Sequence, residues 1–215
     1  MADGVASVPK QYRTLAGATV LEHALAPFLA DTRCRGAVVA IAAGDARWQD
    51  LAVAQDPRVT TVTGGRERRD SVAAAVAALH ARLGPADPWV LVHDAARPCV
   101  SRSEIDALLA ALPRAPDGAL LALPVDDTLK QANAAGRVSA TVPRTGLWRA
   151  LTPQAFRLQR LAAALAAPGG ASDEASAIEA QGGRPQLVVG SPGNIKLTAP
   201  ADFGLAEQIL GGRHP

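Results

Sequence analysis

Cysteine is scarce in this chain of 215 residues: only Cys34 and Cys99 occur, and they lie far apart. We expect both thiols to be reduced and the protein to be cytoplasmic. No apolar stretch approaches the roughly 20 residues that a membrane-spanning helix needs, so no membrane association is expected. The N-terminal sequence MADGVASVPKQYR also lacks the apolar core of a signal peptide.

Basic runs are absent as well, and the net charge is only +2. Nucleic-acid binding is therefore not expected, because it requires a concentrated basic surface. Lysine occurs at Lys10, Lys130 and Lys196 alone, in a chain that is otherwise rich in arginine. Each lysine is therefore a candidate for a specific role, although a loop lysine such as Lys10 is more often simply solvated.

The chain is 48% hydrophobic and long enough to bury one core, so we expect a single domain over residues 1–215. Short apolar runs alternate with segments of helical periodicity, which predicts an α/β fold with a mostly parallel sheet. The predicted strands are 37–43, 59–62, 89–93, 118–125, 186–189 and 194–197, and the predicted helices are 19–30, 45–53, 65–83, 101–112, 154–166, 172–180 and 201–210.

Residues 89–98, WVLVHDAARP, are the segment around which we expect the chain to be organised. The apolar run 89–93 is typical of a strand that is buried on both faces of a parallel sheet. Asp94 follows it, at the sheet edge where ligands of open α/β folds collect, and this position suits a metal or phosphate site. A helix cap or an ion pair with Arg97 is the ordinary alternative for such an aspartate.

Two further segments carry functional candidates. Gly64-Gly65 lies between a predicted strand and helix, where backbone N–H groups can approach a ligand, and Ser71 is in the first turn of that helix. A tight connection is an equally good explanation of the paired glycines. Residues 124–146 lack helical periodicity and predict a hairpin arm, which cannot bury a face by itself and indicates a dimer.

Seven motifs occur in one order along the chain: PKQY, GG-x-x-R-x-DS, VLVHDAARP, the DT of the arm, R-x-GLW-x-ALTPQ-x-F, DEAS and NIKLT. In this order they resemble the 2-C-methyl-D-erythritol 4-phosphate cytidylyltransferases of nonmevalonate isoprenoid biosynthesis. The resemblance covers nearly the whole chain. It implies a Rossmann-like nucleotidyltransferase domain, an arm exchanged across a homodimer, CTP and a sugar-alcohol phosphate as substrates, and Mg²⁺.

The resemblance also implies roles for single residues, which fall into catalytic, nucleotide-binding and substrate-binding groups. Lys10 resembles the lysine that stabilises the transition state, whereas Arg144 of the partner's arm and Lys196 resemble the pair that holds the substrate phosphate. Asp94 resembles the acid beside the metal-bound triphosphate. The remaining matches are Gly64, Gly65, Ser71 and Ala95 on the nucleotide side, and Arg97, Thr128, Thr152 and Ser172 on the substrate side.

One departure from the family concerns the front of the chain. The family begins with a strand and a glycine-rich A-A-G-x-G-x-R loop around the triphosphate, whereas this sequence has MADGVAS immediately before PKQY. We therefore expect the first strand and that phosphate cradle to be missing. Two rival hypotheses stay open: a sibling enzyme that acts on a polyol phosphate such as ribitol 5-phosphate, and a dimeric chain that does not hold CTP.

Overall fold

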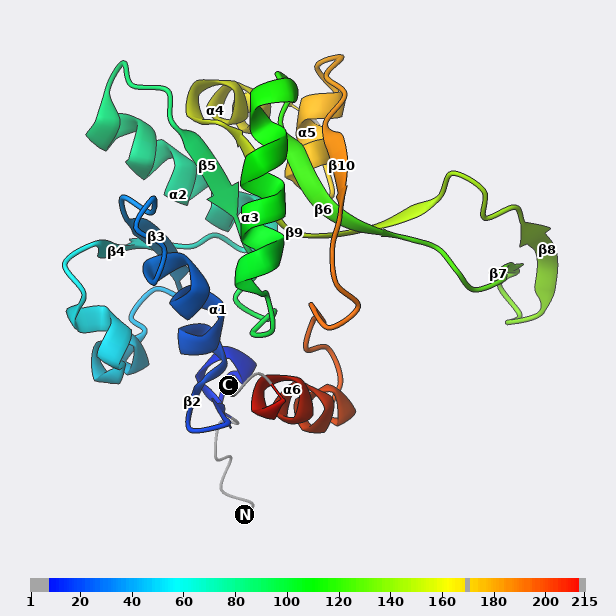
Figure 1. Ribbon diagram of the computed structural model, residues 1–215, viewed down its shortest axis with the longest axis horizontal. Helices are drawn as coiled ribbons and strands as arrows, with labels where there is room; N and C mark the ends of the chain where they lie inside the picture. The colour runs from blue at the N-terminus through cyan, green and yellow to red at the C-terminus, as the bar shows by residue number, and fades with distance from the viewer. Residues whose placement is uncertain (1–7, 169–170, 213–215) are drawn as a thin grey trace.

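The computed structural model describes residues 8–168 and 171–212, in which helices and strands alternate (Figure 1). The expectation of a missing first strand concerns residues 1–7, which lie outside the described residues. The helices are α1 (Val20–Leu29), α2 (Arg68–Leu83), α3 (Arg102–Ala111), α4 (Leu158–Ala166), α5 (Glu174–Glu179) and α6 (Ala201–Gly211). The strands are β1 (Thr14–Leu15), β2 (Ala18–Thr19), β3 (Ala37–Ile41), β4 (Val59–Thr63), β5 (Trp89–Val92), β6 (Ala119–Pro124), β7 (Leu129–Ala132), β8 (Val138–Val142), β9 (Trp148–Arg157) and β10 (Gln186–Val189).

The sheets are small and mixed. A four-stranded sheet has the order β10-β6-β9-β5, in which β10 and β6 are parallel whereas β9 is antiparallel to both of its neighbours. Strands β3 and β4 form a separate parallel pair. The α/β class is confirmed, but the expectation of a mostly parallel sheet is met only by these two parallel pairs. The difference arises because β9 inserts between β5 and β6.

Helices cover both faces of the four-stranded sheet. Leu120 of β6 packs in a core cluster with Phe156 of β9 and with residues of α2, α4 and α5. The next residue, Leu121, packs on the other face with Leu108 of α3. Neighbouring residues of one apolar strand thus serve two different cores, which is why β6 has no polar alternation.

Three predicted elements differ in the structure. The helix predicted for 154–166 begins only at Leu158, because Gln154–Arg157 continues β9. The segment 45–53 forms two short 3₁₀ turns, Ala46–Asp50 and Ala52–Gln55, in place of one helix. Residues 194–197, predicted as a strand, have no regular structure and form a loop, here called the lysine loop.

Strand β5 is also less enclosed than predicted. All four of its residues are partly exposed, because β5 is the last strand of the four-stranded sheet as described. The start of α3 matches the sequence, with Ser101 and Glu104 forming the predicted capping box. The predicted arm is present: β7 and β8 form an antiparallel hairpin that extends well away from the rest of the chain (Figure 1). No helix of the described ranges is long and apolar enough to cross a membrane.

Candidate active site

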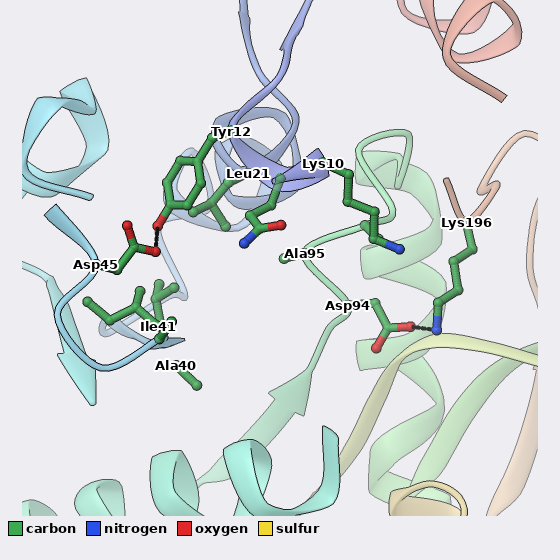
Figure 2. A pocket seen from close by; sticks show the side chains of 13 residues that line it. Lys10, Tyr12, Leu21, Ala40, Ile41, Asp45, Asp94, Ala95 and Lys196 are labelled. Atoms are coloured by element: carbon green, nitrogen blue, oxygen red, sulfur yellow. Dashed lines mark hydrogen bonds and ion pairs between the residues drawn. The ribbon is translucent and has the colours of Figure 1, made fainter. Parts of the chain in front are cut away.

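A cavity of about 270 Å³ opens between several parts of the chain. Lys10 and Tyr12 come from the N-terminal segment, Ile41 from the end of β3, and Lys196 from the lysine loop (Figure 2). The turn that follows β5, residues 94–97, supplies Asp94, Ala95 and Ala96 and is here called the site turn. The site turn is closed by a hydrogen bond from the Arg97 N–H to the Asp94 carbonyl, 2.9 Å long.

The carboxylate of Asp94 is surrounded by cationic groups. Its Oδ2 atom is 2.9 Å from Lys196 Nζ, and its Oδ1 atom accepts a hydrogen bond of 2.7 Å from Arg68 Nε (the first contact is drawn in Figure 2). The Nε atom of Arg97 is 3.8 Å from Oδ2. Burial alone would raise the pKa of Asp94, but the charges and hydrogen bonds of Arg68 and Lys196 outweigh burial and hold this pKa at about 2. Asp94 is therefore ionised at any physiological pH.

Arg68 connects the site to α5. Its Nη1 and Nη2 atoms donate to the two carboxylate oxygens of Glu174, at 2.7 and 2.9 Å, while its Nε atom contacts Asp94. The side chain of Glu174 is only 1% exposed, so the carboxylate of this bidentate ion pair is removed from water, whereas the Arg68 side chain is partly exposed. The sequence analysis did not single out either residue, although Arg68 is the arginine of the GG-x-x-R-x-DS motif and Glu174 the glutamate of DEAS.

The lysine loop is fastened to the site turn. Arg97 Nη1 donates to the Asn194 carbonyl at 2.7 Å, and the Leu197 N–H donates to the Ala96 carbonyl at 2.8 Å. The ammonium of Lys10 donates to the Leu197 carbonyl at 3.0 Å. These contacts bring Lys10 and Lys196, from the two ends of the chain, to the same cavity as Asp94.

Thr152 also lies at the site turn, but its hydroxyl already has partners. This side chain is buried, and its Oγ1 atom accepts from the Asp94 N–H at 3.1 Å and lies 2.9 Å from His93 Nδ1. His93 Nε2 in turn lies 3.0 Å from the Arg97 carbonyl oxygen. Burial lowers the pKa of His93 to about 4, so its ring is neutral at pH 7.

Comparison with known proteins shows to which family the chain belongs. The sequence model of the 2-C-methyl-D-erythritol 4-phosphate cytidylyltransferases (IspD) matches residues 4–212. The chain belongs to this family. A relative in Pseudomonas putida (strain W619) with the same description is 50% identical over 209 residues, which are 95% of this chain and 89% of the relative. A relative in Ectopseudomonas mendocina (strain ymp) is 50% identical over 204 residues, which are 93% of this chain and 87% of the relative.

Solved structures agree with this membership. A crystal structure described as 4-diphosphocytidyl-2C-methyl-D-erythritol synthase superposes with a TM-score of 0.86 at 40% identity, over 94% of this chain and 95% of that one. The 2-C-methyl-D-erythritol 4-phosphate cytidylyltransferase of Francisella tularensis has a TM-score of 0.79 at 31% identity, over 96% and 95% of the two chains.

In this cytidylyltransferase, the paired glycines are required by close contacts at the start of α2. A Cβ atom on Gly64 would lie 2.7 Å from Ser71 Oγ, and one on Gly65 would lie 2.1 Å from the Cβ atom of Asp70. The Gly65 N–H donates to Ser71 Oγ at 3.2 Å. Since Arg68 of the same segment contacts Asp94, this turn borders the site.

Three of the predicted site residues lie outside the cluster around Asp94. Thr128 and Arg144 are exposed on or beside the arm. Ser172 is exposed before α5, with its Oγ atom 3.4 Å from that of Ser176. Within one copy of the cytidylyltransferase, the described contacts therefore unite Lys10, Asp94, Ala95, Arg97, Thr152 and Lys196, and leave the arm residues apart.

The far wall of the cavity carries a pair that the sequence analysis missed. The Tyr12 hydroxyl donates to Asp45 Oδ2 at 2.8 Å, and the two residues face Lys10 and Asp94 across the opening (Figure 2). Burial and the hydrogen bond to Asp45 raise the pKa of Tyr12, so its hydroxyl remains protonated. Tyr12 is the only tyrosine of the chain and belongs to the PKQY motif, which was the available signal.

Proposed function

We propose that this enzyme transfers the cytidylyl group of CTP to 2-C-methyl-D-erythritol 4-phosphate, and that Asp94, Lys10 and Lys196 form the centre of the site. The transfer is the activity of the family to which the chain belongs. A phosphate-monoester oxygen attacks the α-phosphorus of CTP, and pyrophosphate leaves from the opposite side. Two lysines from opposite ends of the chain line the cavity of Asp94, and Lys196 pairs with this largely buried carboxylate; this is the observation that carries the residue assignment.

The charge balance of the cluster suits two anionic substrates. Three cationic side chains, Arg68, Arg97 and Lys196, contact the carboxylates of Asp94 or Glu174. Lys10 lines the same cavity, so these four cations outnumber the two carboxylates. Nucleophile and electrophile are both phosphates, so the main barrier is to bring like charges together. Catalysis therefore depends on charge neutralisation and positioning, and no side chain has to act as a base.

The lysines and the arginine have different roles. Lys10 and Lys196 are compact point charges on flexible stems, suited to the oxygens around the reacting phosphorus as charge develops there. Arg97 is buried, and among the described residues its Nε atom has no hydrogen-bond partner. That free N–H and the planar guanidinium fit a phosphate or hydroxyl oxygen of the acceptor substrate.

The nucleotide binds along the cavity. The Gly64-Gly65 backbone and Ser71 read the cytosine, while the backbone at Ala95 approaches the phosphates. Glycine is needed at positions 64 and 65 because a side chain would collide with the first turn of α2. The N–H groups of Gly64 and Gly65 already donate to the Ile41 carbonyl and to Ser71 Oγ, so we expect their carbonyl oxygens to meet the amino group of the cytosine.

Mg²⁺ fits the site through Asp94. Within residues 8–168 and 171–212, no group of three or more His, Cys, Asp and Glu side chains is arranged as a metal cage. Mg²⁺ commonly takes only one or two protein carboxylates together with substrate phosphates, so Asp94 alone could hold it. When bound, the ion neutralises triphosphate oxygens. Lys196 Nζ lies 2.9 Å from Asp94 Oδ2, so Mg²⁺ would share this oxygen with Lys196 or replace that contact.

The arm completes the site of a neighbouring subunit in our proposal. Thr128 and Arg144 are exposed and remote from Asp94 in their own chain, and the hairpin buries little of its own surface. A homodimer that exchanges arms would bring Arg144 to the acceptor phosphate held by Lys196 of the other subunit.

Steady-state kinetics with pyrophosphate release as the readout test the residue assignment. We expect Lys196→Ala and Lys10→Ala each to lose about 3 kcal/mol of transition-state stabilisation, the typical cost of one preorganised donor. Arg114→Ala, which removes an exposed cation distant from the site, is the control and should keep the wild-type rate. Unchanged rates for both lysine variants would refute the assignment.

The same assay tests the first of the two rival hypotheses. A higher kcat/KM with ribitol 5-phosphate than with methylerythritol phosphate would identify the sibling activity. Calorimetry with CTP and Mg²⁺ tests the other rival, because a chain that does not hold the nucleotide releases no heat of binding.

Mixing two inactive variants tests the shared site. If Arg144 acts in the partner's site, a heterodimer of Arg144→Ala and Lys196→Ala subunits contains one intact site. Equal mixing with free exchange should therefore restore about a quarter of the wild-type activity. A mixture that stays inactive, although the subunits exchange, contradicts the arm proposal.

A further inference from the structure

His93 and Thr152 form a closed hydrogen-bond circuit with the site turn. The ring of His93 contacts Thr152 Oγ1 through Nδ1 at 2.9 Å and the Arg97 carbonyl through Nε2 at 3.0 Å. Thr152 Oγ1 accepts from the Asp94 N–H at 3.1 Å. The circuit therefore touches both ends of the turn whose side chains are the carboxylate and the guanidinium of the site.

The chemistry of the partners fixes every proton in this circuit. A carbonyl oxygen only accepts, so His93 Nε2 must carry the hydrogen that it donates to Arg97. In the neutral ring Nδ1 is then an acceptor, and the Thr152 hydroxyl donates to it. The lone pairs of that hydroxyl remain for the Asp94 N–H. Each ring nitrogen of His93 therefore acts in one direction only, whereas the Thr152 hydroxyl donates one hydrogen bond and accepts another.

An irregularity of β9 aims Thr152 at the turn. The pairing of β9 with β6 shifts register between Leu120 and Ala122, whose partners are Gln154 and Ala150. The extra residues on the β9 side include Thr152. Such bulges redirect side chains and are frequent beside active sites. Here the bulge lies next to the end of β5, where the site turn begins.

We propose that His93 is a positioning residue for cytidylyl transfer, which acts through the Thr152 hydroxyl on Asp94 and through the Arg97 carbonyl on Arg97. This inference rests on the proposed function of the site turn. His93 touches no reacting atom. It holds the backbone on which the carboxylate and the guanidinium depend, and a displacement of about 1 Å in such groups can cost about 100-fold in rate.

Paired substitutions at the two positions test the circuit. Thr152→Val keeps the shape of the side chain and removes the hydroxyl, whereas Thr152→Ser keeps the hydroxyl. We expect Thr152→Val to lower kcat by about 10- to 100-fold with KM for CTP changed by less than about 3-fold, and Thr152→Ser to stay within about 3-fold of the wild type. His93→Phe should reproduce the Thr152→Val effect, and His80→Phe on the exposed face of α2 is its control.

Combining His93→Phe with Thr152→Val distinguishes a circuit from two independent contributions. The double variant should be no more than about 3-fold slower than the slower single variant, because both changes break the same chain of contacts. Multiplicative losses would overturn the proposal. So would a kcat for folded Thr152→Val within about 2-fold of the wild type, measured well below its melting temperature.

Nitrogen NMR of the His93 ring gives a readout that requires neither activity nor a variant. We expect the neutral tautomer with its proton on Nε2 at pH 7, and a ring protonated on Nδ1 would overturn the circuit. A wild-type enzyme without turnover of CTP and methylerythritol phosphate refutes the proposed function instead. If the wild type is active and the Thr152→Val variant is equally active, the positioning role is wrong and the proposed function stands.

Discussion

Removal of Arg68 gives the most direct test of how the site cluster is held together. Arg68→Met keeps much of the aliphatic stem but leaves the carboxylate of Glu174, 1% exposed, without its bidentate partner. Removing one member of a buried ion pair typically costs about 3–5 kcal/mol. The side chain of Arg68 is 33% exposed, so water can partly replace it, and we expect a loss of about 2–3 kcal/mol of unfolding free energy.

Urea unfolding at pH 7 measures this loss. With a slope of about 2–3 kcal/mol/M for a chain of this size, the midpoint should fall by about 1 M while the slope stays constant. Glu174→Gln and the double variant complete a thermodynamic cycle. Arg68→Met should cost about 2 kcal/mol less in the Glu174→Gln background, because no buried charge is then left unpaired. Additive effects, or a loss below about 0.5 kcal/mol for Arg68→Met, would refute the reasoning.

Three further predictions concern acid sensitivity, a crowded glycine and the core. Burial lowers the pKa of His93 from 6.5 to about 4, so the His93 ring takes up a proton at a higher pH in the unfolded chain than in the folded one. The free energy of unfolding should therefore fall by about 3 kcal/mol as the pH falls from 6.5 to 4. Urea midpoints across this range check it, and His93→Gln should remove this part of the slope. Gly118→Ala should cost about 2 kcal/mol or more in thermal unfolding, because its φ is +92° and the new Cβ would lie 2.2 Å from the ring of Phe156; Gly136→Ala, with a similar φ of +72° but open space, is the control. Phe156→Ala, fully buried, should cost about 3–5 kcal/mol, whereas Leu205→Ala at an exposed position should stay within about 0.5 kcal/mol.

Local sequence patterns predicted most elements but not how they pair. The apolar runs at β3, β5 and β6 and the capping box of α3 depend on neighbouring residues, so they were visible in the sequence. Strand β9 was partly mistaken for a helix, because its last residues, QAFR, continue smoothly into the alanine- and leucine-rich sequence of α4. Its place in the sheet depends on pairing with β5 and β6, which are distant in sequence.

The residues of the candidate site likewise divide into those that local sequence predicted and those that depend on contacts between distant parts of the chain. Asp94 was predicted from its place after an apolar strand and from motif order, and Lys10 and Lys196 from motif order and from the scarcity of lysine. Arg68 and His93 were not assigned to it, because their importance comes from contacts that no spacing rule reveals: Arg68 reaches Glu174 across 106 positions of the chain, and His93 reaches Thr152 across 59.

The single strand β9 has a mechanical consequence for the dimer that we propose. It begins at Trp148, where the arm joins the rest of the chain, and ends at Arg157, the residue before α4, with Thr152 between the two. In such a dimer, a subunit that binds the arm would also displace β9, whose Thr152 accepts the hydrogen bond of the Asp94 N–H. Since packed interiors transmit displacement rather than absorb it, docking of the arm and alignment of the reacting groups are linked along one piece of polypeptide.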